Sequence, residues 1–305
     1  MNAIECDALT RHFGKVRAVD RLTLQVPSGS VFALLGSNGA GKTTLLKLIL
    51  NLLRPSSGQA RVLGGNSANL RADTFQRIGY VAEDLIQPDW MELPAFLRYY
   101  RSLYRSWDPT LESHLRAKFA LPEGVAVRRF SRGMRMKAIL LTTLCFRPEL
   151  LILDEPFSGL DPQVRDDLIE GILELMTASS PCTVVISSHD IAEIERMADW
   201  VGILANGRIV VAEPLTELQG RFRRIEVVGP EVRQRIPNPT PAEWVRTEAT
   251  TPNLVQFIHT RFGDRTESEL RSIFLGDRIQ SSPLSLREIF LATSKLSPSV
   301  NGLPT

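Results

Sequence analysis

Short apolar runs alternate with helical patterns along most of the chain. Three of these runs contain no charged residue, as is typical of strands that are buried in a parallel sheet; they are residues 31–35, 150–153 and 183–187. A fourth run, at 78–82, has the same character. The first run is followed at helical spacing by Leu45, Leu46, Ile49 and Leu53. Strands that alternate with helices in this way predict an α/β fold with a parallel sheet that is covered on both faces.

The remaining patterns predict a small antiparallel sheet and an inserted helical subdomain. In residues 1–30, apolar and polar residues alternate before the turn at 27–29, which is typical of half-buried antiparallel strands. Residues 85–140 instead carry helical patterns that prolines interrupt at Pro94, Pro109 and Pro122. Further along, Asn206-Gly207 lies between two apolar runs and indicates a hairpin.

Capping residues predict where several helices begin. Asp161 is placed as the N-cap of a long helix that has Pro162 in its first position, and Asp190 as the cap of the helix after residues 183–187. The apolar face of the long helix consists of Val164, Leu168, Ile172, Leu175 and Met176. Residues 266–269 and 285–288 each fit a capping box, so two short helices are expected near the C-terminus.

A change in composition at residues 213–223 predicts a boundary between two domains. We expect a first domain at 1–215, which contains the helical subdomain, and a small α+β C-terminal accessory domain at 222–296. Pro237, Pro239 and Pro241 predict a loop within the second domain. Residues 297–305 are expected to form a disordered tail.

Charge and composition exclude several functional classes. The formal charge is +2 and the pI about 8.5, which is too balanced to indicate nucleic acid as an obligatory partner. Cys6, Cys145 and Cys182 form no Cys-x-x-Cys pair and indicate reduced thiols of a cytoplasmic protein. The N-terminus lacks the pattern of a signal peptide, and no window has the roughly 18 apolar residues that span a bilayer. Any role at a membrane is therefore expected to depend on a partner.

The first apolar run leads into a glycine-rich sequence that is typical of a phosphate-binding loop. The motif lies between a predicted strand and a predicted helix, as it requires, and consists of Gly36, Ser37, Asn38, Gly39, Ala40, Gly41, Lys42 and Thr43. Its glycines let backbone N–H groups surround an anion, and the helix N-terminus adds a favourable dipole. We expect Lys42 to contact the β- and γ-phosphates of a nucleotide and the Thr43 hydroxyl to bind Mg²⁺.

Two adjacent carboxylates follow the second apolar run. Asp154 and Glu155 lie at the end of this predicted strand, where an uncompensated pair of charges is costly. The cost favours a functional site in which a cation or a proton compensates them. Glu83 and His189 follow two further strands. A lone histidine is more often structural, so the role of His189 depends on its context.

The order of these motifs closely resembles that of the ATP-binding subunits of ABC transporters. The phosphate loop is followed by Phe130-Ser131-Arg132-Gly133-Met134, the Asp154-Glu155 pair, Ser158-Gly159-Leu160-Asp161 and His189, and the resemblance covers residues 1 to about 215. It implies that Asp154 binds Mg²⁺, that Glu155 is the general base for the attacking water and that His189 hydrogen-bonds the γ-phosphate. Thr44 and Asp161 are implied to be further nucleotide-binding residues.

The same resemblance implies a second ATPase subunit. Ser131 and Gly133 match the signature loop, which in this family caps the γ-phosphate of ATP held by the other subunit, so the site is shared across a dimer. A homodimer is favoured because Glu155 and His189 are both present, and a heterodimer stays open. Phe13 stands where the family has an aromatic residue that stacks on adenine, with ordinary packing as the alternative.

Two departures from the family pattern point to one of its branches. Glu83 replaces the usual glutamine, and because an ionised carboxylate only accepts hydrogen bonds, it suits Mg²⁺ or water better than a phosphate. Arg132 replaces the first glycine of the signature and Met134 its glutamine. These changes, together with residues 285–290, look like the drug- and antibiotic-exporter branch.

The predicted helical subdomain carries basic and aromatic residues that allow two interpretations. Its basic residues outnumber its acidic ones, which indicates either a solvated face or contact with a membrane subunit or anionic lipid. Four aromatic residues follow helical spacing, and they form either the core of the subdomain or a docking surface for the membrane subunit: Phe96, Tyr100, Tyr104 and Trp107.

We therefore interpret the chain as the ATP-hydrolysing subunit that powers an ABC transporter, expected to be an exporter, through separately encoded transmembrane permease subunits. Its expected location is cytoplasmic, peripheral on the inner face of the cell membrane. The alternative is a soluble ABC ATPase that acts on nucleic acid or ribosomes. Such proteins commonly carry tandem cassettes or long coiled coils, and this sequence has neither. A regulatory module without turnover would lack the base, whereas Glu155 is present.

Overall fold

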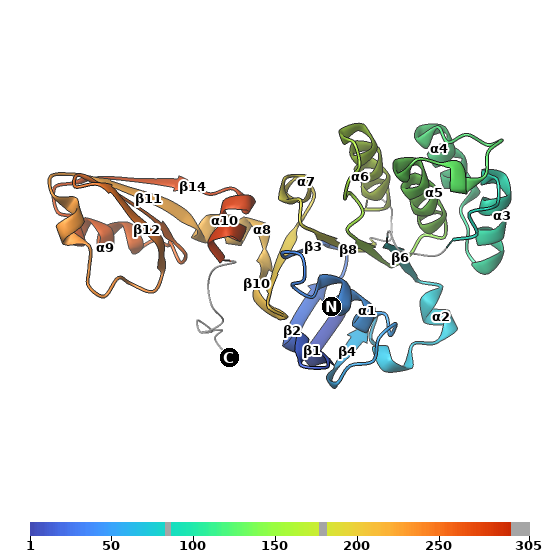
Figure 1. The fold of residues 1–305 in the computed structure, drawn as a ribbon, viewed down its shortest axis with the longest axis horizontal. Helices are drawn as coiled ribbons and strands as arrows, with labels where there is room; N and C mark the ends of the chain where they lie inside the picture. The colour runs from blue at the N-terminus through green and yellow to red at the C-terminus, as the bar shows by residue number, and fades with distance from the viewer. Residues whose placement is uncertain (83–86, 177–181, 294–305) are drawn as a thin grey trace. The chain divides into compact units, whose positions relative to one another are not determined.

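The computed structural model describes residues 1–82, 87–176 and 182–293. The chain divides into two compact units, Met1–Ala212 and Glu213–Thr305, which are coloured blue to yellow and yellow to red in Figure 1. The predicted tail at 297–305 lies outside the described residues. Within the described ranges, no helix combines the length and the apolar character that crossing a bilayer requires.

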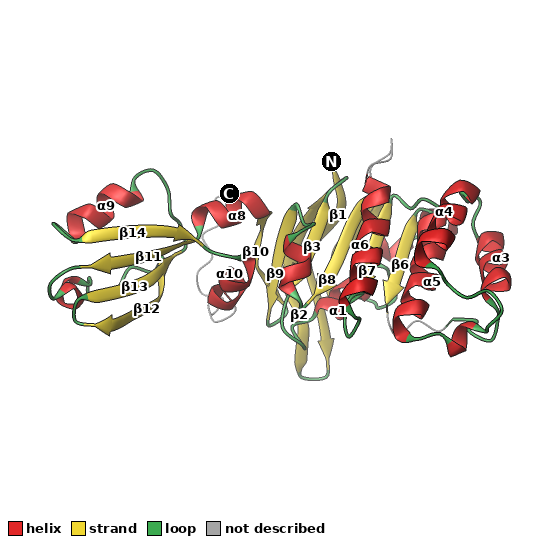
Figure 2. Cartoon of the chain, turned by 90° about the horizontal axis from the view of Figure 1, so that it is seen from above, coloured by secondary structure: helices red, strands yellow, loops and turns green. Residues whose placement is uncertain are grey.

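A mostly parallel sheet forms the centre of the first unit, as the apolar runs predict. Its strand order is β10-β9-β3-β8-β7-β6, and its strands are β3 (Val31–Leu35), β6 (Ile78–Ala82), β7 (Leu150–Asp154), β8 (Thr183–Ser188), β9 (Trp200–Ala205) and β10 (Arg208–Pro214) (Figure 2). Strand β3 pairs in parallel with both β8 and β9, and β7 with both β6 and β8. Every residue of β3 and β7 is buried, because both faces of the sheet are covered.

One face of this sheet packs on a helix and a second, antiparallel sheet. The helix is α1 (Lys42–Ile49), and the antiparallel strands are β1 (Asn2–Phe13), β2 (Val16–Pro27), β4 (Ser57–Val62) and β5 (Gly65–Asn66), in the order β2-β1-β4-β5. The predicted alternation in β2 is confirmed, since Leu22, Leu24 and Val26 are buried. Together with α1 and the central sheet they form one apolar core.

Helix α6 (Pro162–Met176) lies on the opposite face, and three helices form the predicted helical subdomain beside strand β6 (Figure 1). These three are α3 (Leu93–Leu103), α4 (Pro109–Phe119) and α5 (Arg132–Cys145), and both α3 and α4 pack on α5. The chain also contains the short helix α2 (Ala72–Phe75) and the 3₁₀ turns Ser67–Asn69 and Val127–Arg129. Pro94 and Pro109 lie in the first turns of α3 and α4, where a missing N–H has no helical partner to lose. Two basic residues of the subdomain pair with α6: Lys118 Nζ lies 2.7 Å from Glu174, and Lys137 Nζ lies 2.6 Å from Asp167.

The two helices after β7 and β8 begin where the capping residues predict. Asp161 caps α6, since its Oδ1 accepts a hydrogen bond from the N–H of Val164 at 3.0 Å. Asp190 precedes α7 (Ile191–Glu195), but its side chain makes no capping hydrogen bond, so this part of the prediction is wrong. The carboxylate of Asp190 instead accepts from the guanidinium group of Arg165, which is a charged and therefore stronger donor.

The second unit is a small α+β domain. Its antiparallel sheet has the order β12-β13-β11-β14, and its elements are α8 (Leu215–Arg221), β11 (Arg223–Val228), the 3₁₀ turn Val232–Arg235, β12 (Trp244–Thr251), β13 (Leu254–His259), α9 (Thr266–Ile273), β14 (Arg278–Pro283) and α10 (Leu286–Thr293) (Figure 2). Trp244 stacks on Phe257, with ring centroids 4.0 Å apart, in a core that also contains Leu270 of α9. The predicted proline loop lies between the 3₁₀ turn and β12.

One of the two predicted capping boxes is confirmed and the other is wrong. At α10, Ser285 donates from its hydroxyl to Glu288 at 2.8 Å, and Glu288 also accepts from the N–H of Ser285 at 2.9 Å. At α9, Thr266 is already the first helical residue, and Arg265 occupies the N-cap position. The Thr266 hydroxyl accepts from the N–H of Gly263 at 3.0 Å, so it serves the preceding turn instead of the helix.

Candidate functional site

The glycine-rich loop joins β3 to α1 and is packed tightly against two other segments. Gly41 has a φ of +108°, and a Cβ at this position would lie 2.3 Å from the carbonyl oxygen of Ala18. A Cβ on Gly36 would lie 2.8 Å from the carbonyl oxygen of Leu204. The loop therefore needs glycine at both positions, because strand β2 and the end of β9 leave no space for a side chain.

The turn between β9 and β10 supports the loop through its backbone. Asn206 and Gly207 both have positive φ, as the predicted hairpin turn requires. The N–H of Gly207 donates to the carbonyl of Ala40 at 3.0 Å, and its carbonyl accepts from the N–H of Asp20 at 2.9 Å. A hydrogen bond from Arg208 lowers the pKa of Asp20 and keeps this carboxylate charged. The loop is thus held by residues that lie far from it in sequence.

Lys42 is the buried cation of the site. Only 6% of its side chain is exposed, and its ammonium group donates to the carbonyl of Gly36 at 2.7 Å. The same group lies 3.1 Å from Oε1 of Glu155. Lys42 therefore supplies the compensating charge that a carboxylate at the end of a buried strand needs.

Asp154 lies at the end of β7 and accepts two hydrogen bonds on one oxygen. The hydroxyl of Thr43 donates to its Oδ1 at 3.2 Å, and the hydroxyl of Ser187 donates to the same atom at 2.6 Å. Ser187 is fully buried and also accepts from the N–H of Glu155 at 3.0 Å. Sequence reasoning placed Ser187 in a core strand and missed this contact. The signal that could have found it is register, since parallel β8 sets Ser187 beside Asp154.

Glu155 lies between the buried lysine and an exposed histidine. Its backbone has a φ of +51°, which turns the chain sharply out of β7. Oε2 lies 2.7 Å from Nδ1 of His189, and the N–H of His189 also approaches it, at 3.4 Å. About half of the His189 side chain, 48%, is exposed. Glu155 therefore contacts Lys42 through one oxygen and His189 through the other.

A cavity of about 370 Å³ lies over these residues. It is lined by Ala18, by each residue of the loop from Ser37 to Thr44, and by Glu155. Within the described ranges, no group of three or more His, Cys, Asp and Glu side chains could hold a metal ion by itself. Thr43 and Asp154 do offer two hard oxygen donors side by side, which suits Mg²⁺ when phosphate and water provide the remaining ligands.

Two residues predicted for the site, Phe13 and Asp161, do not line this cavity. Phe13, at the end of β1, is 45% exposed, and the guanidinium carbon of Arg11 lies 4.8 Å from the centre of its ring. Asp161 caps α6, as described above. Glu83, which is predicted to bind Mg²⁺ or water, lies outside the described residues.

The signature residues lie at the start of α5. Ser131 is its N-cap and accepts from the N–H of Met134 at 3.2 Å. A Cβ on Gly133 would lie 3.1 Å from the side chain of Val164, so a glycine here lets α5 approach α6. Arg132, the departure from the family pattern, covers the backbone of Gly159, where an added Cβ would lie 2.3 Å from its Nη1. The signature loop of this chain is thereby in contact with the loop that follows Glu155.

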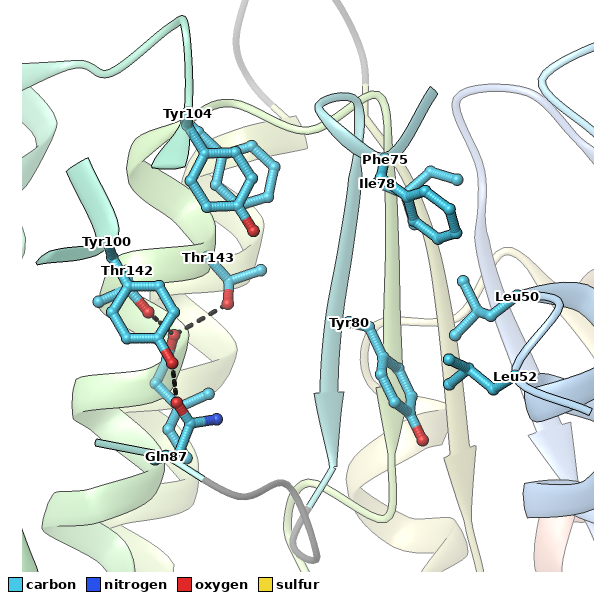
Figure 3. Close-up of a pocket in the computed structure, with 12 residues that line it drawn as sticks. Leu50, Leu52, Phe75, Ile78, Tyr80, Gln87, Tyr100, Tyr104, Thr142 and Thr143 are labelled. Atoms are coloured by element: carbon cyan, nitrogen blue, oxygen red, sulfur yellow. Dashed lines mark hydrogen bonds between the residues drawn. The ribbon is translucent and has the colours of Figure 1, made fainter. Parts of the chain in front are cut away.

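A second cavity, of about 350 Å³, lies between the central sheet and the helical subdomain (Figure 3). Tyr80 of β6 and Tyr100 of α3 line it, and the hydroxyl of Tyr100 is hydrogen-bonded to Gln87. Tyr104 stacks on Phe146, with centroids 3.8 Å apart. Of the four predicted aromatic residues, Phe96 is fully buried and belongs to the subdomain core. Tyr100 and Tyr104 are half-buried and border the cavity, and their contact with a membrane subunit stays a prediction.

Comparison with known proteins identifies the family. A family model described as ABC transporter matches residues 19–158. An uncharacterised ABC transporter ATP-binding protein from Synechocystis sp. is 35% identical over 222 residues, which are 70% of this chain but only 61% of that protein. The bacitracin transport ATP-binding protein of Bacillus licheniformis is 31% identical over 72% of both chains.

One relative extends the match into the second unit. The Nod factor export ATP-binding protein I of Neorhizobium galegae is 31% identical over 303 residues, which cover 95% of this chain and 84% of that protein. A solved structure, described as the ATP-binding subunit of an ABC transporter, is 27% identical with a TM-score of 0.64 and covers 72% of this chain and 92% of its own. The chain belongs to the family of ABC transporter ATP-binding proteins.

Proposed function

We propose that this chain binds ATP with Mg²⁺ and hydrolyses it to power an ABC exporter. The observation that carries the proposal is the arrangement of Glu155, which touches the buried ammonium group of Lys42 on one side and His189 on the other beside the loop cavity. A phosphate-binding loop, a carboxylate in position to accept a proton and a neighbouring imidazole are the parts that nucleoside triphosphate hydrolysis needs.

The loop and its neighbours account for nucleotide binding. Backbone N–H groups of residues 37–44 surround the phosphates, and Lys42 neutralises their charge. Thr43 and Asp154 would hold Mg²⁺, which offsets the negative charge that develops on the phosphate oxygens. The exposed ring of Phe13 is the proposed stacking partner of adenine, with Arg11 on its other face.

The same contacts account for the chemistry. Glu155 is the proposed general base, which accepts a proton from the attacking water, and His189 is the proposed hydrogen-bond partner of the γ-phosphate. In the structure Lys42 is paired with Glu155. A bound phosphate competes for that ammonium group, so nucleotide binding would release the carboxylate for its role as base.

A second copy of the ATPase subunit is part of the proposal. Ser131 and Gly133 lie at the start of α5, whereas the residues that line the loop cavity come from 18, 37–44 and 155. This separation supports a site that the signature loop of another subunit completes. A homodimer is the favoured form, because this chain carries both Glu155 and His189.

The remaining partners are proposed to be membrane subunits that form the transport path. The relative named for Nod factor export supports export as the direction. The proposed contact with the membrane subunit is the tyrosine-lined cavity between the central sheet and the helical subdomain. The proposed location of the chain is the inner face of the membrane. The relatives give no support to a role on nucleic acid or ribosomes, so that alternative is not proposed.

Replacement of the proposed base tests the function. Glu155→Gln keeps the size of the side chain but cannot accept a proton, so phosphate release by the purified chain should fall by about 10²- to 10⁴-fold. ATP affinity should not fall, because Lys42 and Thr43 are retained and Lys42 loses a competing carboxylate. Light scattering should detect a dimer with Mg-ATP. Glu170→Gln removes an exposed carboxylate from α6 and is the control. Hydrolysis by Glu155→Gln at the parent rate would contradict the proposal.

A further inference from the structure

Arg165, in the first turn of α6, joins two loops that flank the proposed base. Its Nε donates to the carbonyl oxygen of Leu160 at 3.0 Å, and its Nη1 donates to Oδ2 of Asp190 at 2.9 Å. Leu160 belongs to the loop between Glu155 and α6. Asp190 follows His189 directly in the chain. One guanidinium group therefore holds both loops at once, which its fork of donors makes possible.

These contacts are part of a closed ring that begins and ends at Glu155. On one side, the N–H of Ser158 donates to the carbonyl of Glu155 at 3.2 Å, and the loop continues through a second turn to Leu160. Arg165 connects this loop to Asp190, whose N–H donates to the hydroxyl of Ser188 at 2.9 Å. From there Nδ1 of His189 returns to the carboxylate of Glu155 at 2.7 Å. The ring therefore connects the loop that carries His189 to the loop that follows Glu155.

The use of Asp190 indicates that the pair serves more than helix stability. Asp190 stands at the N-cap of α7, where its carboxylate could cap the helix, yet it bonds to Arg165 instead. The pair is partly solvated, with 22% of the Arg165 side chain and 41% of the Asp190 side chain exposed. Ion pairs with this exposure contribute little to folding. The two hydrogen bonds of Arg165 beside the site therefore suggest that it fixes the relative position of the two loops.

We propose that Arg165 is a positioning residue, which acts through Asp190 and Leu160 to hold His189 against Glu155 without touching the nucleotide. The proposal rests on the proposed function of Glu155 as base. Loss of the guanidinium group frees the His189 loop and the Leu160 loop from each other. Small displacements of catalytic groups reduce turnover strongly while they leave substrate binding intact.

The test uses the full chain and a matched control on the same helices. Arg165→Ala and Asp190→Asn remove the two ends of the ion pair, separately and together. The control is Arg196→Ala, because Arg196 also links the end of α7 to α6, with its Nη1 at 3.3 Å from Asp166. ATP turnover, ATP affinity and the melting temperature are measured for each variant. The chain has four histidines, so NMR of ¹³C-labelled histidine resolves His189 once His189→Gln assigns its peak.

Arg165→Ala and Asp190→Asn should each lower kcat by about 10- to 100-fold and leave KM within about 3-fold. The double variant should lose little more than either single one, because both remove the same contact. The His189 resonance should shift in all three, and neither readout should change in Arg196→Ala. Arg165→Lys should recover part of kcat, since lysine keeps the charge but not the fork.

Two results would overturn the positioning role. One is a His189 resonance and a kcat that stay at the parent values in Arg165→Ala. The other is a loss of kcat, ATP affinity and melting temperature by equal proportions in both Arg165→Ala and Arg196→Ala, which would assign Arg165 to folding alone. Failure of the proposed function is a separate outcome, because it appears as full turnover in Glu155→Gln. In that case the NMR shift of His189 still shows whether Arg165 affects the position of the histidine.

Discussion

The ammonium group of Lys42 lies 3.1 Å from Oε1 of Glu155, so the cation of the phosphate loop is paired with the proposed base. Because the lysine is buried, removal of either partner leaves an uncompensated charge. The lysine of the phosphate loop therefore also fixes one oxygen of the proposed base.

Replacement of Lys42 should abolish productive nucleotide binding. Lys42→Ala removes the point charge that the β- and γ-phosphates need, and ATP affinity should fall at least about 10-fold, as expected for a lost charged hydrogen bond. Equilibrium binding of a fluorescent ATP analogue measures the affinity. Lys47→Ala removes the same charge from the last turn of α1 and should bind as the parent does. Equal affinity in all three proteins would refute the role of Lys42.

Alanine at Gly41 should damage the loop more than its backbone conformation alone explains. A left-handed φ costs an L-residue about 1–2 kcal/mol. Gly64→Ala isolates this cost, because Gly64 has a φ of +81° and open space around it. Gly41→Ala adds a collision with the carbonyl of Ala18, so its free energy of unfolding should fall further and ATP binding should fail. Urea denaturation that gives equal losses for both variants would contradict the packing argument.

Removal of the Ser187 hydroxyl should weaken both the fold and the site. Ser187→Ala leaves Asp154 without its shortest donor, and the free energy of unfolding should fall by about 1–3 kcal/mol. The control is Ser30→Ala, which removes another buried hydroxyl, bonded to the carbonyl of Pro27 at 2.8 Å. Only Ser187→Ala should also lower ATP turnover, by about 10-fold or more, because it displaces Asp154 and Glu155. If Ser187→Ala hydrolysed ATP at the parent rate, Ser187 would have no role in the site.

Those parts of the molecule that local patterns determine could be predicted from the sequence. Residues 31–35 and 150–153 form buried strands because an uncharged apolar run has no other stable location. The position of the phosphate loop follows in the same way from its glycines and its flanks. The helical start at Asp161 was also predictable, because the capping bond spans only three residues.

The remaining features depend on contacts between distant residues. Ser187 and Arg165 have no local pattern, and only the packed structure brings them to Asp154 and Asp190. The two wrong capping predictions have the same cause. Asp190 and Thr266 have suitable side chains for an N-cap, but a charged partner and a preceding turn use them instead. The local preference of a residue for the N-cap position is overridden where a tertiary contact is stronger.

The first unit should fold without the second. A chain that ends at Pro214 keeps all of β10 and every strand of the central sheet, so it should unfold in one cooperative transition and bind ATP. Calorimetry and nucleotide binding check both properties. A chain that ends at residue 199 is the control, since it lacks the turn that supports Ala40, and it should bind no ATP. Loss of cooperative unfolding in the longer chain would show that the second unit stabilises the first.

The support of the phosphate loop by Ala18 and Gly207 limits how the motif can be transferred or recombined. A graft of residues 36–43 onto another strand and helix would carry the phosphate ligands without the two backbone contacts that shape the loop. A chimaera of two relatives that joins them between residues 43 and 200 would combine a loop from one parent with a supporting turn from the other. Compatible crossovers must therefore keep residues 18, 40 and 207 from a single parent, although they span most of the first unit.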